Sequence, residues 1–566
     1  MSPFASYAIL CLALLAPLLA WQSAARLLSR GGEAAPRIGR RYADAVMAGA
    51  LAVATLAISS QLLAVRPLIE GVDFYYYLCV ARDLADGAPT SQTRHFYFPG
   101  VYRFWGAVFA VFGRSLPAIQ TAYLALLVAN AAAIAAVVWR GVGSAAPALL
   151  AGLLYLALCS SLEGFAGITE PLATLPVLVG LAVWAGEPLA GRRGLARALV
   201  LGAGLGLGVY AKQLAGLLAL GAAALPLVNA AAPRDLRHRW AYLALIPAAA
   251  TLVLLVGILA EGDGLAPLRI GLSAVSGYEP QGTLQGRLRW VVAHAPLLFA
   301  ATVGFLAIYA LLALVPRWRP LLGERWAALA GFAFLGALAA LAQFSRRAYL
   351  HYALLLAPLA IVAITLVATA LVRRLPTRVA AWPGTQLVVA ALAGLPLVQP
   401  PQGEGLLHAW PLAIRVELAQ PPPWRAQPDI AADLAVLKSL LQPGEDLLII
   451  PPRRNEIHFQ LGTRSRSFAP GYSWAPGRGV VEAAVRNPEL DAVLLLRTHL
   501  DATDVEVWHS LDCDRGASAL IAAGFRPLRK LRTMTLYRRR ASEARSEPQA
   551  SGVHSSLPQA SEVHQD

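Results

Sequence analysis

The chain has 566 residues, of which 57% are hydrophobic and only 14% are charged, and its formal net charge is +15. This composition excludes an ordinary soluble protein of that length, which would alternate its apolar helices with charged faces. The basic residues lie in short loops between apolar runs, as topology determinants do, so the positive charge does not indicate nucleic-acid binding. The sequence predicts a polytopic α-helical membrane protein.

Apolar runs recur from the N-terminus to about residue 400, and most are long enough to cross about 30 Å of hydrocarbon. The first run, 6–22, has no basic segment before it and several arginines after it, which favours a retained helix over a cleaved signal peptide. We expect about twelve membrane-spanning helices: this run and 44–64, 116–139, 145–161, 172–186, 198–211, 213–230, 241–260, 294–315, 326–343, 350–372 and 383–400.

The charges of the short loops predict the topology. If the N-terminus lies outside, every short basic loop falls on the cytoplasmic side, where arginines are favoured. These loops contain Arg26 to Arg41, Arg140, Arg192 to Arg197, Arg234 to Arg239, Arg317 to Arg325 and Arg373 to Arg378. The opposite side then receives the loop 65–115, the turn at Lys212, the loop 261–293 and everything after 401. We expect a multi-pass protein of the inner (plasma) membrane with these segments outside the cytoplasm.

The composition of the sequence changes after residue 400. A Pro-rich linker, 401–428, follows the membrane domain 1–400. Beyond it, an amphipathic helix is predicted at 429–441, buried strands at 446–450 and 492–496, and closing strands at 524–525 and 534–537. We expect a small extracytoplasmic α/β domain over 429–540. The tail 541–566 is rich in Ser, Glu, Gln and Ala and is predicted to be disordered.

The four cysteines, Cys11, Cys79, Cys159 and Cys513, are scattered without a C-x-x-C pair. They predict neither a zinc site nor a disulfide framework. Cys11 and Cys159 fall in predicted spans and are most simply small apolar residues. A bridge between Cys79 and Cys513 outside the cell stays open as an alternative.

A carboxylate at the outer surface of the membrane is the first candidate for a catalytic group. Asp73 follows a long apolar run, and a partly dehydrated carboxylate there is costly and usually marks a working site. Other polar groups on the predicted outer side are His95, Tyr97, Tyr102, Arg103, Glu170, Lys212, Gln213, Arg346, Arg347, Tyr349 and His351. An acid facing several cations has the parts needed to deprotonate a nucleophile while a phosphate is clamped.

Each of these groups also has a structural alternative. Asp73 could only cap the helix that begins at Phe74, and the tyrosines at 75–77 could form an aromatic belt at the lipid headgroups. Glu170, before a proline, could only start a helix, and the Arg346–Arg347 pair could bind lipid phosphates without specificity. Lys212 lies between two apolar segments, so it must either snorkel to water or pair with an acid.

The ensemble of motifs resembles the GT-C superfamily of membrane glycosyltransferases over about residues 40–400. Within it, the chain looks most similar to family 39, which groups protein O-mannosyltransferases, lipid A aminoarabinose transferases and bacterial relatives that use polyprenyl-phosphate sugars. The motifs are Asp73 with Tyr75-Tyr76-Tyr77-Leu78, Phe96-Tyr97-Phe98-Pro99-Gly100, Thr169-Glu170-Pro171, Lys212-Gln213 and Arg346-Arg347-Ala348-Tyr349-Leu350-His351-Tyr352.

The resemblance implies roles for three positions. Asp73 matches the catalytic aspartate of the first outer loop, and Lys212 and the Arg346–Arg347 pair match basic groups that hold the lipid phosphate. Many members follow the aspartate with a second acid, whereas here Phe74 follows Asp73. This departure gives no support for a metal bound at an Asp-Glu pair, so no cofactor is expected.

These observations predict an integral-membrane glycosyltransferase. It would move a monosaccharide from a polyprenyl-phosphate-linked donor to a hydroxyl of a glycan, lipid or protein acceptor, with Asp73 as general base and inversion of configuration. Lys212, Arg346, Arg347 and His351 would bind the donor phosphate, and the substrate would contact His95, Tyr97, Tyr102, Arg103, Glu170, Gln213 and Tyr349.

Two other classes of protein are alternatives to an enzyme. A transporter or flippase of lipid-linked substrates would place charges near helix midpoints and show repeated halves, whereas the charges here lie at the outer helix ends. A membrane-anchored scaffold would need its C-terminal domain to do the work. That domain has no nucleophile motif, no Gly-rich phosphate loop and no metal-ligand spacing.

Overall fold

The computed structural model describes a large part of the chain in separate stretches. These are residues 72–89, 98–143, 145–161, 167–185, 191–218, 236–276, 352–374, 428–450, 455–464, 492–496 and 520–539, with short pieces between 283 and 337 and residues 487 and 490. The predicted spans 6–22, 44–64 and 383–400, nearly all of the linker 401–428 and the tail 541–566 lie outside the described residues.

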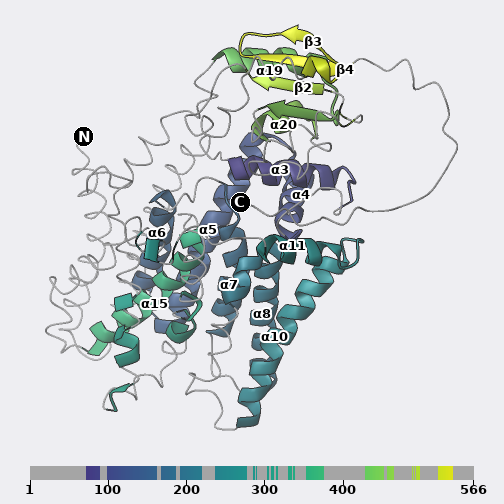
Figure 1. Cartoon of the computed structure of the whole chain (residues 1–566). Coiled ribbons are helices and arrows are strands. Elements are labelled where there is room, and N and C mark those ends of the chain that lie inside the picture. Colours follow the sequence, from purple (N-terminus) through teal and green to yellow (C-terminus); the bar gives the residue numbers. More distant parts are fainter. Residues whose placement is uncertain are drawn as a thin grey trace, which may run out of the picture.

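A bundle of apolar helices forms the larger part of the molecule (Figure 1). Its helices are α5 (Leu116–Val142), α6 (Ala145–Ser161), α7 (Glu170–Trp184), α8 (Gly191–Ala211), α10 (Leu236–Leu259) and α15 (Ala353–Arg374). Within the described stretches, three segments are long and apolar enough to cross a membrane: Leu116–Val142, Arg193–Ala211 and Trp240–Leu259. The helical membrane architecture agrees with the expectation, and the number of twelve spans stays a prediction.

The helix boundaries lie close to the predicted ones. Helix α6 covers the predicted span 145–161, and α8 ends at Ala211, as expected for the turn at Lys212. Helix α10 begins at Leu236, five residues before the predicted start of its apolar run at 241. Backbone hydrogen bonding continues into the polar loop there, whereas the prediction followed hydrophobicity alone.

The predicted outer loops contain further helices. The loop 65–115 includes α3 (Val72–Ala85) and α4 (Gly100–Phe112), and the loop 261–293 includes α11 (Ala266–Ser276). A 3-10 turn, η3 (Gln213–Leu217), follows Lys212. Helices over residues 100–112 and 266–276 were not predicted, because helices of 13 and 11 residues are too short to produce a spanning signal.

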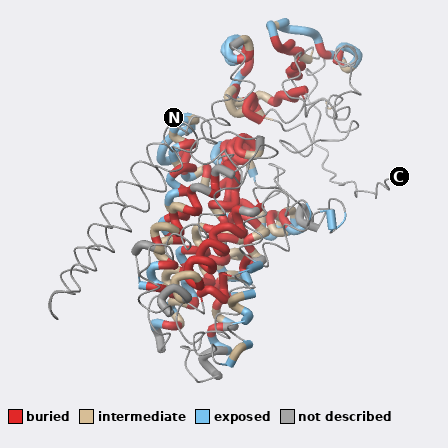
Figure 2. Tube along the Cα trace, turned by 90° about the vertical axis from the view of Figure 1, so that its left-hand side faces the viewer, coloured by how far each residue is buried: buried red, intermediate tan, exposed pale blue. Residues whose placement is uncertain are grey.

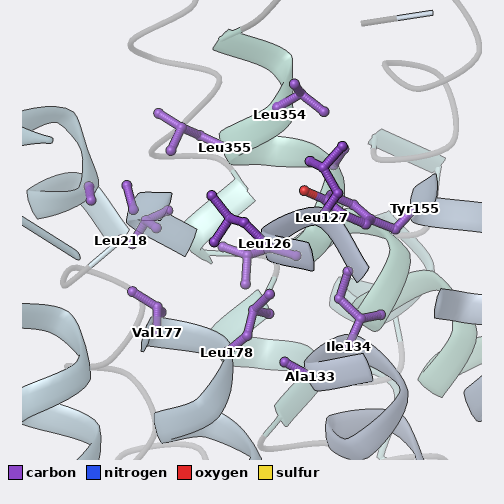
Figure 3. Packing of buried hydrophobic residues seen from close by; sticks show 14 of the residues in the cluster. Leu126, Leu127, Ala133, Ile134, Tyr155, Val177, Leu178, Leu218, Leu354 and Leu355 are labelled. Carbon is purple, nitrogen blue, oxygen red and sulfur yellow. The ribbon is translucent and has the colours of Figure 1, made fainter. Parts of the chain in front are cut away.

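The core of the bundle runs along its centre, where buried residues form a continuous column (Figure 2). Leucine, isoleucine and valine side chains of α5, α7 and α15 interdigitate there with Tyr155 of α6 (Figure 3). Close packing of α8 depends on glycine. A Cβ on Gly202 or Gly206 would lie 2.4 Å from a carbonyl oxygen of α10, and one on Gly204 would lie 2.3 Å from a carbonyl oxygen of α7. Small residues on two faces thus let α8 pack against both neighbours.

The C-terminal elements form a four-stranded sheet with two helices. They are α19 (Pro428–Leu440), β1 (Leu447–Ile450), α20 (Asn455–Leu461), β2 (Ala492–Leu496), β3 (Phe525–Lys530) and β4 (Met534–Arg539). The strand order is β1-β2-β4-β3, with β1 and β2 parallel and the other pairs antiparallel. Strands β1 and β2 are buried on both faces, which explains their uninterrupted apolar sequences.

The described C-terminal elements fall at the predicted places, since α19 and the first two strands differ from expectation by one residue or less at each end. Helix α20 was not predicted, because its sequence, NEIHFQL, is short and mostly polar. In Figure 1, α20 lies between the sheet and α3. The domain limits and the extracytoplasmic position of this unit stay predictions.

Candidate functional site

Helix α3 carries the predicted base. Asp73 lies in its first turn and is half-buried. A carboxylate is favoured at this position by the partial positive charge of the helix N-terminus. The tyrosines at 75–77 are only 2–3% exposed and belong to the core, so they pack inside the protein instead of forming an outward aromatic belt.

Phe74, the residue that follows Asp73, is a packing residue of the core. Its ring is fully buried and lies edge-on to Trp105, with the ring centroids 5.4 Å apart. Gly167, with φ +72°, approaches the same ring so closely that a Cβ would lie 2.3 Å from it. This contact places the segment leading to Glu170 against the first turn of α3.

A buried ion pair joins Glu170, the first residue of α7, to Lys212, which follows the last residue of α8. The Lys212 ammonium donates a hydrogen bond to Glu170 Oε1, and the two side chains are 1% and 0% exposed. Lys212 Nζ also lies 4.9 Å from the centre of the Tyr352 ring. Of the two outcomes expected for this lysine, snorkelling or pairing, pairing is therefore the one observed.

Two buried oxygen atoms next to this ion pair have unused hydrogen-bonding capacity. Glu170 Oε2 and Thr169 Oγ1 are buried and have no hydrogen-bond partner among the described residues. Burying such oxygens without a partner costs free energy, and exceptions of this kind often mark a place where a ligand or water binds. The pair therefore has the character of a polar binding site inside an apolar bundle.

A second buried residue, which the sequence reasoning missed, holds this site in place. Asn130 of α5 is fully buried and donates a hydrogen bond of 2.8 Å to the carbonyl oxygen of Pro171. Its Oδ1 accepts a bond of 2.9 Å from Thr174 Oγ1. These bonds tie the first turn of α7 to α5. The signal was an asparagine in the middle of an apolar span, where polar side chains usually bond across helices.

Arg103 binds a residue that was not predicted. Its guanidinium donates to both carboxylate oxygens of Glu261, at 2.6 Å from Nη2 to Oε2 and 3.1 Å from Nε to Oε1. The Tyr210 hydroxyl donates to the same carboxylate at 2.5 Å. The Glu261 side chain is 2% exposed and that of Arg103 is 47% exposed. This cluster links α4, α8 and the end of α10 next to Lys212.

The remaining predicted site residues divide into two groups. Tyr102 is fully buried and shares a hydrogen bond with the Tyr76 hydroxyl, and Gln213 Nε2 donates at 3.4 Å to the carbonyl oxygen of Gly271 in α11. The other predicted residues lie outside the described part of the chain: His95, Tyr97, Arg346, Arg347, Tyr349 and His351. In the described stretches, no three His, Cys, Asp or Glu side chains lie together as a metal site would require.

No family model and no curated protein matches the sequence. Comparison of folds gives a different result. The crystal structure of ArnT from Cupriavidus metallidurans bound to undecaprenyl phosphate is similar over 87% of this chain and 98% of that chain, with a TM-score of 0.54 and 14% sequence identity. The chain therefore shares its fold with that structure. The structure of ArnT in the apo state gives the same coverage and identity and a TM-score of 0.53.

A weaker likeness, with a TM-score of 0.43 and 12% identity, is found to the oligosaccharyltransferase of Archaeoglobus fulgidus tethered to an acceptor peptide. That match covers 77% of this chain and 68% of the other. The likeness to ArnT agrees with the fold that the resemblance implied. At this level of identity it establishes the fold alone, and the chemistry must be argued from the residues.

Proposed function

We propose that this protein is an integral-membrane glycosyltransferase that takes a monosaccharide from a polyprenyl-phosphate-linked donor. The observation that carries the proposal is the buried pair of Lys212 and Glu170, and Glu170 comes three residues after Gly167, which packs against Phe74 beside Asp73. An ammonium has three N–H donors, so Lys212 can donate to a lipid-linked phosphate within the apolar bundle while it is bonded to Glu170. The GT-C fold supports this, because ArnT has been crystallised with undecaprenyl phosphate.

In the proposed reaction the acceptor hydroxyl attacks the anomeric carbon of the sugar. The bond between that carbon and the phosphate oxygen breaks, and the polyprenyl phosphate leaves with the electron pair. Asp73 accepts the hydroxyl proton as the new bond forms. Lys212 stabilises the negative charge that develops on the leaving phosphate. A single displacement of this kind inverts the configuration at the anomeric carbon.

The other predicted residues complete the proposal. Arg346, Arg347 and His351 would assist Lys212 at the phosphate. His95, Tyr97, Tyr102, Arg103, Glu170, Gln213 and Tyr349 would shape the site for sugar and acceptor. The reaction would take place on the extracytoplasmic side of the plasma membrane. No metal ion is required, since the cations can neutralise the leaving phosphate.

The test is a transfer assay with the purified protein in lipid nanodiscs and a panel of radiolabelled polyprenyl-phosphate sugars. The wild type should release label from the lipid to an acceptor, and Asp73→Asn should lower the rate by about 10²–10⁴-fold, the usual contribution of a general base. Asp429→Asn is the matched control, because Asp429 lies in the C-terminal unit and pairs at the surface with Arg532.

Three results would contradict the proposal. A folded Asp73→Asn variant that transfers sugar at the wild-type rate would exclude Asp73 as the base. Retention of configuration in the product would exclude a single displacement. Movement of the labelled lipid across the bilayer without any transfer would favour the alternative, a transporter or flippase.

A further inference from the structure

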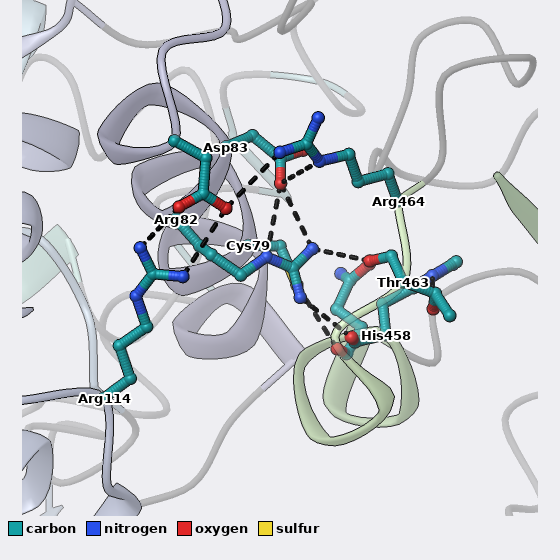
Figure 4. Close-up of polar contacts among 9 residues, drawn as sticks. Cys79, Arg82, Asp83, Arg114, His458, Thr463 and Arg464 are labelled. Atoms are coloured by element: carbon teal, nitrogen blue, oxygen red, sulfur yellow. Dashed lines mark hydrogen bonds and ion pairs between the residues drawn. The ribbon is translucent and has the colours of Figure 1, made fainter. Parts of the chain in front are cut away.

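Helix α3 contacts the C-terminal unit through a buried arginine that the proposed reaction does not use. Arg82, in the last turn of α3, is 5% exposed. Its Nη1 donates to the carbonyl oxygen of His458 at 3.0 Å, and its Nη2 donates to that of Thr463 at 2.5 Å (Figure 4). Both acceptors belong to the segment that forms and follows α20.

The bond to His458 satisfies a carbonyl group at the end of α20, and the bond to Thr463 holds the segment that follows it. The last four carbonyl groups of a helix have no partner inside the helix, and His458 is the first of those four in α20. A positive side chain at this end also complements the negative partial charge of the helix C-terminus. Arg82 therefore caps α20 from a different part of the chain.

A thiol hydrogen bond and aromatic ring contacts surround this cap. Cys79 Sγ donates to the carbonyl oxygen of Asn455 at 3.5 Å, and burial raises the pKa of the Cys79 thiol well above its ordinary value. The ring of Phe459 lies 6.0 Å from that of Tyr75 in α3 and 6.3 Å from that of Phe109 in α4. Cys79 is a buried free thiol packed against α20, and Cys513 lies outside the described residues, so the bridge considered from the sequence has no support.

A ring of charged groups closes the contact on one side. Arg464 lies 3.6 Å from Asp83 and 3.3 Å from Asp86, and Arg114 lies 2.5 Å from Asp86 on its other side. Partial burial opposes the charge of Asp86, but the hydrogen bonds and charges of Arg114 and Arg464 outweigh it and lower the pKa of Asp86. Figure 4 shows Asp83 of α3 and Arg464 of the segment after α20 pointing toward one another.

The histidine under the cap is adapted to its cationic neighbour. Burial, and secondly the charge of Arg82, lower the pKa of His458 to about 3. His458 is thus neutral near pH 7, and its Nδ1 lies 3.1 Å from Thr463 Oγ1. Arg82 and Arg464 share the Asp83 carboxylate, at 3.2 Å and 3.6 Å, and a positive charge on His458 would add to the repulsion on Arg82.

We propose that Arg82 is a positioning residue for Asp73, which it serves by clamping α3 under α20. This inference rests on the function proposed above. Asp73 and Arg82 lie on one unbroken helix of 14 residues, about 13 Å apart along its axis, so the two ends move together. Phe74 holds the first end against the bundle, and α20 holds the second. A shift of about 1 Å in a catalytic group can cost on the order of 100-fold in rate.

The experiment compares Arg82→Gln with Arg82→Lys and with Arg532→Gln, a control in the C-terminal unit that pairs with Asp429 away from α3. For Arg82→Gln we expect kcat to fall roughly 10- to 100-fold while the donor KM changes less than about twofold, since the donor site is untouched. Arg82→Lys should recover part of the rate because it keeps the charge. Arg532→Gln should behave as wild type.

Amide hydrogen exchange supplies a readout that does not depend on activity. In Arg82→Gln, exchange should quicken in residues 455–464 and also in residues 73–78, the end of α3 that carries Asp73. Faster exchange confined to 455–464, or an unchanged kcat in spite of a loosened α20, would overturn the proposal. If the wild type transferred no sugar, the proposed function would fail, and the exchange at 73–78 would still decide whether Arg82 controls that turn. If Arg82→Gln did not fold, Arg82→Lys would be judged by the same two measurements.

Discussion

The strongest quantitative expectation concerns the ion pair between Glu170 and Lys212. The perturbation is Lys212→Met, which keeps most of the side-chain volume and removes the charge. With both side chains at most 1% exposed, the remaining carboxylate cannot reach water. Breaking a buried pair by removing one partner costs about 3–5 kcal/mol, so we expect a loss of stability of that size.

The double variant Lys212→Met/Glu170→Gln should recover most of this loss. Replacing both charges of a buried pair by uncharged groups of similar volume is often close to neutral, so the coupling energy in the double-mutant cycle, which includes Glu170→Gln as the second single variant, should be about 3 kcal/mol or more. The assay is denaturant unfolding of the protein in detergent micelles, followed by tryptophan fluorescence. Arg532→Gln is the control: its pair with Asp429 is exposed, so its loss should cost less than about 1 kcal/mol.

Ligand binding tests the proposed role of Lys212 at the phosphate separately from its contribution to stability. Undecaprenyl phosphate at 100 times its Kd should stabilise the wild type by about 2.7 kcal/mol. It should stabilise the double variant much less, because the cation proposed to bind the phosphate is gone. A double variant that is stabilised as much as the wild type would refute Lys212 as a phosphate ligand. A single variant as stable as the wild type would refute the buried pair itself.

Two further expectations concern the ends of α3. The pKa of His458 is about 3 in the folded protein and about 6.5 when unfolded, so the unfolded form binds more protons between these values. The stability of the α20 contact should therefore fall as the pH falls from 6.5 toward 3, by up to about 1.4 kcal/mol per pH unit. Protease cleavage of α20 measured from pH 7.5 to 5 tests this, and a wild-type pH dependence in His458→Gln would contradict it. Gly167→Ala should destabilise the protein by about 2 kcal/mol or more, because its φ is +72° and its Cβ would lie 2.3 Å from the Phe74 ring. Adding Phe74→Leu should restore part of the melting temperature, and an unchanged melting temperature in Gly167→Ala alone would show that the contact is looser than described.

Much of the helical framework could be predicted because the lipid-spanning signal is local. A run of apolar residues long enough to cross the bilayer has few alternatives to a helix, so α5, α6 and α7 were placed within a few residues. Short helices such as α4 and α11 lack that signal. Helix α20 lacks it as well, since it has only seven residues and its polar side chains become buried through tertiary packing.

The candidate site was predictable in its charges and not in its contacts. Glu170 and Lys212 stood out because ionisable residues are costly beside apolar helices, and that cost is visible in the sequence. Their partnership was not visible, since 42 residues separate them. Glu261 was not among the predicted site residues, yet its buried side chain is the partner of Arg103, 158 residues away.

The sequence alone determined the class of the protein, the approximate helices and the candidate acid and cations, because hydrophobicity and charge are properties of single residues and short runs. The tertiary structure decided what those groups meet. Phe74, which follows Asp73, packs against Trp105 in the core, and Lys212 pairs with Glu170. The tertiary structure also brought Arg82 to the end of a helix 376 residues further along the chain. Such pairings depend on how distant helices pack, and no local pattern encodes them.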